Sequence, residues 1–399
     1  MPKRRGRRGR ALGAALVWLG AALPAAAVGL DLGRGLRLVV AGQAQASYGS
    51  DDPGAFNANR SGYVPQRLFR LGLTAELRAG SRLALLSELR SDNLQTFEAA
   101  ALYLRLRLVA QPALDLQAGR IPPLVGGFTR RYGAGEGPLI GTPLPFQYPT
   151  SLRPDLLPPG PDVLLRVRGY GALAGGGGPY DSVGLPLVEG RDWDTGAQAR
   201  LAAGPVELAA AYTRGSACDP VVEDDNAGHA WSARAQWRPA FGLVLAVSGE
   251  RGAYLADGAA YGAWVKALLQ EQHQTVLALD AEYAAGHALL RFELLRSAWE
   301  APTVRPGEPL VAWSAVLEGR YKLAPGLEAG LRGEHVAFDQ LAGRRLADTW
   351  DAPVWRIEAG LARRLRRNVG LAASYQYNWR DGGPRREGGL VSARAQVSF

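Results

Sequence analysis

Apolar and polar residues alternate with a period of two along most of this 399-residue chain. In residues 70–78 the odd positions, from Leu71 to Leu77, are apolar, and the even positions are polar or glycine. The last segment, residues 391–399, alternates in the same way and ends on Phe399. Because successive side chains of a β-strand point to opposite faces, this period predicts strands with one apolar and one polar face.

Three features favour a membrane barrel over a soluble sheet protein. The polar faces carry full charges, many of them arginine. The alternating segments run about 9–12 residues, close to the length that a tilted strand needs to cross a bilayer. Very short turns, such as residues 79–81 and 203–205, alternate with longer polar loops, which is typical of outer-membrane barrels. After residue 27 no apolar run is long enough for a membrane-spanning helix, so a closed barrel is the remaining way to span lipid.

The pattern therefore predicts an all-β fold, a transmembrane antiparallel β-barrel of 16 strands with both ends of the barrel sheet on the periplasmic side. The predicted strands lie near residues 36–48, 66–78, 82–90, 97–109, 114–120, 193–202, 206–214, 229–238, 243–251, 273–284, 288–299, 310–322, 327–338, 352–364, 369–380 and 388–399. Residues 162–169 also look like a strand, and pairing with a strand near 184–190 would give 18 strands as an alternative. Residues 252–272 are a second ambiguous region.

The N-terminus has the layout of a secretory signal peptide over residues 1–27. A basic stretch at residues 2–10 precedes an apolar run from Ala11 to Ala27 that closes on three alanines. An uncleaved anchor helix is the alternative that the length of the run permits. Cleavage would leave residues 28–399 as the barrel. Loss of the six basic residues of the leader would lower the formal charge from +9 to +3, so the basic character of the whole chain does not indicate nucleic-acid binding.

Cysteine and histidine are too scarce for metal or cofactor chemistry. Cys218 is the single cysteine, and the four histidines are scattered along the sequence. An internal disulfide and a multi-cysteine metal site are therefore excluded. We expect no metal, no cofactor and no enzymatic activity.

The excursion, residues 121–191, follows the fifth predicted strand and is too long and too apolar for an ordinary surface loop. Apolar residues outside the bilayer need a place to be buried, and the barrel interior offers one. We therefore expect the excursion to fold inward and narrow the pore, with Arg130, Arg131 and Arg153 facing the channel. A loop that caps the mouth from outside is the alternative.

The alternation also predicts which charges face the barrel interior. Arginines dominate the early wall and acids are denser later, so the charges can form a polarised constriction; a solvated face of paired charges without selectivity is the alternative. The predicted pore-lining residues are Arg70, Glu76, Arg78, Glu88, Arg105, Arg107, Arg200, Arg234, Arg238, Asp280, Glu282, Arg291, Glu293, Glu318, Arg320, Glu328, Arg332, Glu334, Arg356, Glu358 and Arg394.

Two marks give the chain a family resemblance. Arg120, Ile121 and Pro122 end a strand and open the long excursion, and the alternating C-terminal strand ends on Phe399. In these marks the chain resembles Gram-negative outer-membrane porins, loosely the phosphate-selective group. The resemblance implies a 16- or 18-stranded barrel, often a homotrimer, that lies among outer-membrane lipid and lipopolysaccharide. It also implies that the strand ending in Phe399 is the signal read by the barrel-assembly machinery.

The function that follows is passive diffusion of small polar or ionic solutes, with a weak anion preference. The lysines of phosphate-selective members are not matched, because residues 28–399 contain only Lys266 and Lys322. Two rival functions remain: a plugged barrel that serves assembly or adhesion, and an outer-membrane hydrolase in which His335 near Asp339 forms a catalytic pair.

Overall fold

The structure is a computed structural model that describes residues 27–59, 64–131, 137–171, 183–220, 228–256, 272–383 and 385–399. The predicted signal peptide therefore lies outside the described residues, apart from its last position.

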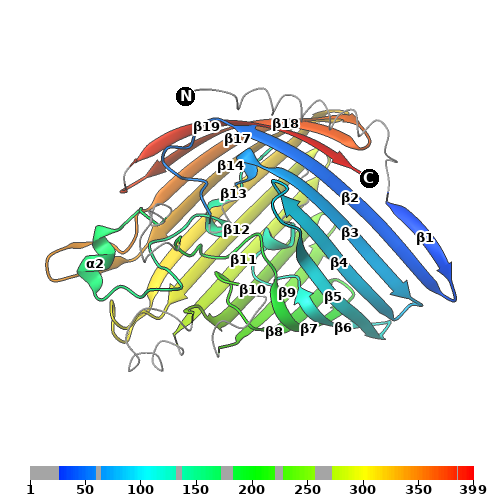
Figure 1. The fold of residues 1–399 in the computed structure, drawn as a ribbon, viewed down its shortest axis with the longest axis horizontal. Helices are drawn as coiled ribbons and strands as arrows, with labels where there is room; N and C mark the ends of the chain where they lie inside the picture. The colour runs from blue at the N-terminus through cyan, green and yellow to red at the C-terminus, as the bar shows by residue number, and fades with distance from the viewer. Residues whose placement is uncertain are drawn as a thin grey trace.

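Sixteen tilted antiparallel strands close into a barrel (Figure 1). The predicted 16-stranded fold is thus confirmed. The strands are β2 (Leu36–Gly49), β3 (Phe69–Ala79), β4 (Leu83–Asp92), β5 (Glu98–Val109), β6 (Ala113–Ile121), β7 (Asp194–Ala203), β8 (Val206–Thr213), β9 (Ala230–Ala240), β10 (Leu243–Ala253), β11 (His273–Ala285), β12 (Ala288–Trp299), β13 (Leu310–Ala324), β14 (Leu327–Phe338), β17 (Val354–Arg366), β18 (Val369–Arg380) and β19 (Glu387–Ser398).

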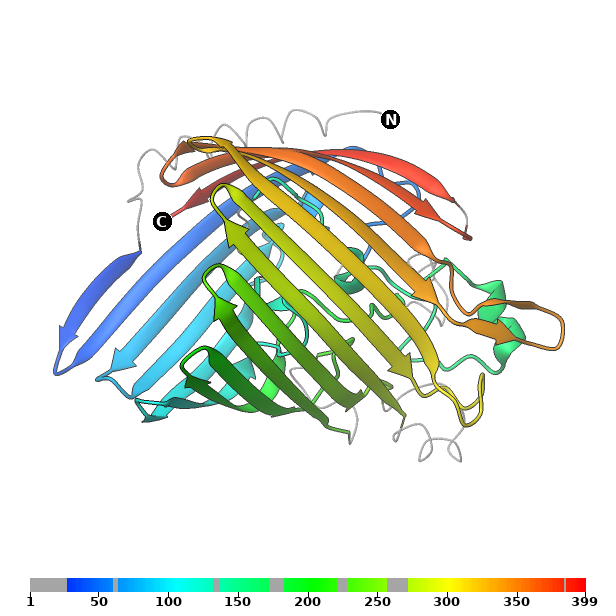
Figure 2. The ribbon, with the colours of Figure 1, turned by 180° about the vertical axis from the view of Figure 1, so that it is seen from behind.

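Each strand pairs with its neighbours in sequence, and β19 pairs with β2 to close the ring. Tight hairpins gather at one end of the barrel and the longer loops at the other (Figure 2). A small hairpin, β15 (Gln340–Ala342) and β16 (Ala347–Thr349), stands in one of these loops. The connections also contain three short 3₁₀ helices: η1 (Pro65–Arg67), η2 (Thr129–Arg131) and η3 (Leu144–Phe146).

One strand was not predicted: β1 (Val28–Gly33), which pairs with the first part of β2. On this edge of β2, β19 reaches only to Gln43, so the backbone groups of residues 36–40 would otherwise lack partners. An unpaired edge presents open hydrogen-bonding groups, and β1 satisfies them by adding a short hairpin beyond the ring.

The prediction of a strand at residues 162–169 is wrong, because Pro161–Arg166 form a short helix, α2. Pro161 occupies the start of the helix, where its missing N–H costs nothing, and Asp162 lies in the first turn. The described residues near 184–190 form no strand either, so the 18-stranded alternative fails. In the region 252–272, β10 ends at Ala253, and residues 257–271 lie outside the description. Among the described residues no helix is both long and apolar enough to cross a membrane.

Large apolar side chains cover the outer face of the barrel. Trp231 is 68% exposed and Trp355 is 52% exposed, as expected for rings that would face lipid. Phe399 lies an even number of residues after Val391, which is 60% exposed, so it shares that outward face. Its backbone pairs with Gly42 through hydrogen bonds of 2.7 and 2.9 Å. A Cβ atom on Gly42 would lie 2.3 Å from the Phe399 ring, so any larger residue there would force the ring to move.

Candidate functional site: the barrel interior

Along β11 to β14 and β17, the predicted pore-lining residues alternate with exposed apolar side chains and therefore lie on the interior face. One row of these residues forms a cross-strand charge ladder: Glu282, Arg291, Glu318, Arg332 and Glu358 stand directly opposite one another on five successive strands of the ring, β11 to β14 and β17. The signs alternate at every step, and the ion-pair distances are 2.7, 3.1, 3.5 and 2.6 Å. Opposite charges on directly paired positions stabilise a sheet, so the ladder ties this wall together.

The ladder also holds the excursion inside the barrel. Glu358 accepts hydrogen bonds from the backbone N–H groups of Ile140 and Gly141 at 2.8 and 2.9 Å. Arg332 donates to the carbonyl oxygen of Gly141 at 2.6 Å. Arg332 is only 2% exposed and Glu358 is fully buried, because residues 139–144 of the excursion cover them. Wall charges thus satisfy the buried backbone of an irregular segment, which needs such partners wherever it leaves water.

A second anchor lies near the start of the excursion. Gly126 donates to the Ser248 hydroxyl at 3.0 Å, and Gly127 donates to the Glu293 carboxylate at 2.8 Å. Arg234 pairs with Asp280 through two hydrogen bonds and also donates to the Gly126 carbonyl at 3.2 Å. The excursion is therefore fixed to two separate parts of the wall, as expected for an inward-folding segment.

The later part of the excursion packs under the long loops. Its apolar side chains share one buried cluster with residues from the ends of β12, β13, β14 and β17. The excursion contributes Leu144, Tyr148, Leu152, Leu157, Leu164, Leu165, Leu185 and Leu187, and the wall and loops contribute among others Trp299, Val336 and Trp350. Burial of these side chains supplies the hydrophobic term that holds the segment in place.

Asp351 completes this attachment from the loop before β17. It accepts hydrogen bonds from the N–H groups of Ser151 and Gly169 at 2.6 and 2.7 Å. Burial raises the pKa of the Asp351 carboxyl, and these hydrogen bonds oppose that shift.

Another part of the interior wall stays accessible to water and is rich in arginine. Glu76 pairs with Arg78 at 2.7 Å and with Arg105 at 3.0 Å, and Arg107 pairs with Asp115 at 2.7 Å. The side chains of Arg78, Arg105 and Arg107 are 48%, 30% and 40% exposed. This region carries more positive than negative groups.

The same excess continues on β7 to β9. Glu207 is the shared partner of three arginines: Arg200 forms a close ion pair with it, and Arg130 and Arg238 lie at 3.6 Å. These ion pairs join six arginines to the three acids Glu76, Asp115 and Glu207; the arginines are Arg78, Arg105, Arg107, Arg130, Arg200 and Arg238. We call these nine residues the basic wall.

The predicted constriction residues have different surroundings. Arg130 belongs to the basic wall through its contact with Glu207. Arg153 pairs with Asp155 at 2.5 Å and is 11% exposed. The side chain of Arg131 lies outside the described part of the chain.

The interior residues divide into two groups by accessibility. Arg70, Arg234, Asp280, Glu293, Glu318, Arg332, Glu334, Arg356 and Glu358 are buried under the excursion or loops. The accessible group includes two acids that were not among the predicted pore-lining residues, Asp115 and Glu207. Both stand at inward positions of predicted strands, so the alternation itself could have identified them.

The proposed hydrolase pair does not meet. The ring of His335 stacks on Trp355 on the outer face, with ring centres 3.7 Å apart. Within the described residues no hydrogen bond joins His335 to Asp339, and no group of three histidine, cysteine, aspartate or glutamate residues could hold a metal ion.

Comparison with known proteins identifies the fold. No family model and no curated protein sequence matches the chain. Among solved structures, the anion-selective porin of Comamonas acidovorans is 13% identical, with a TM-score of 0.56 over 91% of this chain and 100% of the porin. OmpF of Salmonella typhi, solved with daunomycin, is 12% identical, with a TM-score of 0.55 over 93% of this chain and 100% of its own.

The outer-membrane channel DcaP of Acinetobacter baumannii is similar to the same degree, at 12% identity and a TM-score of 0.54 over 93% of this chain and 100% of DcaP. At these identities the likeness shows the fold: a porin-like, 16-stranded antiparallel barrel.

Proposed function

We propose that this chain is an outer-membrane porin, a water-filled channel for passive diffusion of small polar or ionic solutes with a weak preference for anions. The observation that carries the proposal is the basic wall. Its six arginines exceed its three acids, and all six arginine side chains are 23–49% exposed. A water-accessible surface with excess positive charge raises the local concentration of anions.

Conductance in a planar bilayer tests this proposal. We expect the wild-type protein to conduct and its reversal potential in a KCl gradient to indicate chloride preference. Replacing Arg78, Arg107 and Arg238 by glutamine should shift the reversal potential toward potassium. The control is the pair Arg67→Gln and Arg251→Gln, because these exposed arginines lie outside the basic wall. An unchanged reversal potential in the triple variant would refute the role of the basic wall.

A plugged barrel is the second candidate, and the buried excursion favours it. The excursion is fixed across the interior by three attachments: the charge ladder, the second anchor and the apolar cluster. If the wild type does not conduct while a variant with a released excursion does, the protein is a plugged barrel.

The resemblance to porins supports assembly as a homotrimer. One of the similar structures, OmpT of Vibrio cholerae, was solved in a trimer form. In this chain the outer faces of β4 and β5 carry leucines, whereas aromatic rings point outward from β9, β13, β17 and β18. The exposed leucines are Leu83, Leu85, Leu89, Leu102, Leu104, Leu106 and Leu108. Aromatic rings fit the lipid headgroup level, and β4 and β5 carry none on their outer faces, so we place the subunit interface there.

Cysteine cross-linking tests the trimer. Cys218 is buried, so an introduced cysteine is the accessible one. Leu104→Cys should give cross-linked oligomers, whereas Leu317→Cys, exposed on the aromatic side, should not. Equal cross-linking at both positions would contradict the assignment of this face.

We also propose that residues 1–27 are a cleaved signal peptide and that the mature barrel lies among outer-membrane lipid and lipopolysaccharide. The C-terminal strand, with Phe399 on its outer face, would be the signal for the barrel-assembly machinery. N-terminal sequencing of the purified protein tests the cleavage, with Val28 expected as the first residue.

A further inference from the structure

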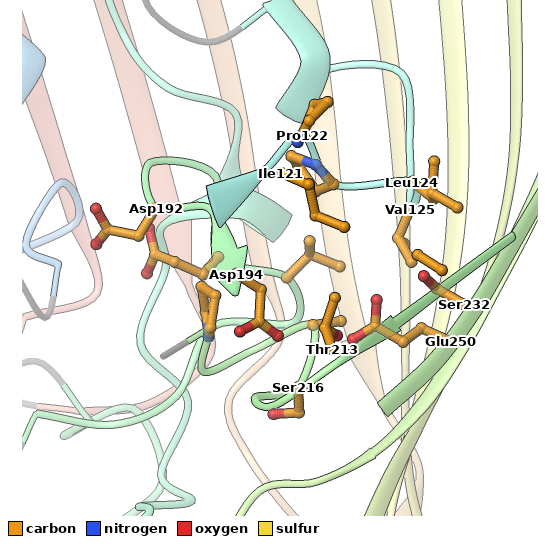
Figure 3. A pocket seen from close by; sticks show the side chains of 16 residues that line it. Ile121, Pro122, Leu124, Val125, Asp192, Asp194, Thr213, Ser216, Ser232 and Glu250 are labelled. Atoms are coloured by element: carbon orange, nitrogen blue, oxygen red, sulfur yellow. The ribbon is translucent and has the colours of Figure 1, made fainter. Parts of the chain in front are cut away.

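A small cavity lies between the first turn of the excursion and the inner wall formed by β8, β9 and β10. Its volume is about 30 Å³, and it is partly open to solvent. Its apolar side is formed by Ile121, Val125 and Val188, and its polar side includes Thr213 and Ser232. Glu250 and Asp194 also line the cavity, and Figure 3 shows both beside Thr213.

Glu250 differs from the other acids of the inner wall. Asp280, Glu318 and Glu358 each have an arginine partner at 2.6–3.1 Å. Within the described residues Glu250 has no side-chain hydrogen bond and no ion pair. The other charge that acts on it is the like charge of Asp194. Glu250 is half-buried and lines the cavity without a counter-charge, so this position favours a cation.

The hydroxyl groups of the cavity are unused as well. Thr213 is 7% exposed and Ser232 is 8% exposed, and neither side chain forms a hydrogen bond within the described part of the chain. Ser232 stands directly opposite Glu250 across β9 and β10, and Thr213 lies diagonally beside Ser232 on β8. Three acceptor groups thus gather at one end of the cavity. Hydroxyl groups of residues as buried as Thr213 and Ser232 are normally satisfied.

We infer that this cavity binds a primary ammonium group, with a short alkyl chain against its apolar side. A primary ammonium carries three N–H donors, which match the Glu250 carboxylate and the hydroxyls of Thr213 and Ser232. The carbon atoms next to the nitrogen contact Ile121 and Val125. A divalent metal ion fits less well, because the described residues contain no set of three acidic, histidine or cysteine ligands. The site goes beyond the proposed channel function, since it requires no open pore.

Calorimetric titration of the full-length protein in detergent micelles with ethylammonium chloride tests the inference. We expect saturable binding by the wild type, and weakening by about tenfold or more for Glu250→Gln, since one charge-assisted hydrogen bond is lost. Glu88→Gln is the matched control: Glu88 is an inward-facing acid that already has Arg90 as partner, so its removal should leave binding unchanged. Tetramethylammonium, a cation without N–H donors, should not bind.

Ser232→Ala serves as the second variant if Glu250→Gln does not fold. It removes one neutral acceptor and should weaken ethylammonium binding about three- to tenfold. Equal binding by wild type and folded Glu250→Gln, or by wild type and Ser232→Ala, would overturn the inference. So would a wild-type barrel of normal circular dichroism that shows no saturable binding. Because these measurements are made without a membrane potential or ion gradient, they can fail while the channel proposal holds, and the reverse is also true.

Discussion

Arg332 is the side chain whose loss should most directly release the excursion. It lies at the centre of the charge ladder, is 2% exposed, and contacts Glu318, Glu334 and Glu358 at 3.5, 2.7 and 2.6 Å. Its fourth contact is the Gly141 carbonyl at 2.6 Å. Arg332→Ala would leave three carboxylates close together and remove one hydrogen bond to the excursion.

The size of the effect follows from the burial of these groups. Removing one partner of a buried ion pair costs about 3–5 kcal/mol, because the other charge is left uncompensated. At about 1.4 kcal/mol per tenfold, this shifts the ratio of docked to released excursion by roughly 10²- to 10³-fold or more. The barrel sheet keeps its backbone hydrogen bonds, so the strands should remain folded while residues 139–144 detach.

Limited proteolysis and single-channel recording measure this release. In Arg332→Ala we expect new cleavage within the excursion and a larger or noisier conductance, with unchanged β-sheet circular dichroism. Arg251→Ala is the control, because Arg251 lies outside the basic wall, pairs only with Glu300 among the described residues and is 53% exposed, and such pairs contribute about 0–1 kcal/mol. If Arg332→Ala shows the protease resistance and conductance of the wild type, the ladder does not hold the excursion.

Three further predictions follow from other contacts. Gly126→Ala should destabilise the docked excursion, because the φ angle of Gly126 is +74° and the new Cβ would lie 2.4 Å from Glu293 Oε1. The backbone conformation alone should lower the free energy of unfolding by about 1–2 kcal/mol, and the clash should lower it further. Thermal unfolding measures this loss. Deletion of Phe399, or Gly42→Leu, should lower the yield of heat-modifiable barrel without changing the conductance of assembled channels. Glu300→Gln should abolish the pH dependence of the protection factor of the His273 amide, which donates to Glu300 just after the end of β12.

The sign of the Glu300 prediction follows from its pKa. Burial alone would raise the pKa of Glu300, but hydrogen bonds from Arg251 and His273, at 2.8 and 3.0 Å, lower it below the ordinary 4.5. The carboxylate therefore stabilises this loop above about pH 4.5, and the contribution is lost as the pH falls through the lower folded value. Wild-type protection of the His273 amide that does not change on acidification would contradict this assignment.

Matched variants separate these effects from general damage. Gly286→Ala shares the positive φ, +54°, but its Cβ would meet nothing within 4 Å, so it should cost less than Gly126→Ala. Gly333, like Gly42, lies on a strand, but no atom lies within 4 Å of the position that a new Cβ would take. The Gly333→Ala protein should therefore assemble normally, whereas the Gly42→Leu protein should not. Equal losses within either pair would show that the specific contacts with Glu293 and Phe399 are unimportant.

The inward positions of the strands could be predicted because a strand has a side-chain period of two whatever its surroundings. Glu282, Arg291 and Glu318 were assigned to the interior from alternation alone, and the register places them there. Their alternation in sign across neighbouring strands could not be predicted. It depends on the stagger between strands, which is set by turn geometry and ring closure.

The error at residues 162–169 has a related cause. Over so few residues a period of two does not distinguish a strand from one helical turn. Pro161 at the first position favours a helix, and hydrogen bonds from the backbone of residues 344–346 to the Asp162 carboxylate stabilise it. These contacts join segments about 180 positions apart in the sequence.

By itself, the sequence determined the class of fold, the strands, the outward side of Phe399 and the candidates for the interior, because each of these follows from local alternation and turn chemistry. The tertiary structure decided which interior charges hold the excursion and which stay open to water. Arg332 and Arg107 both stand at inward positions, yet one is buried by residues 139–144 and the other is 40% exposed. That difference arises from where a long irregular segment is buried, which depends on contacts between distant parts of the chain.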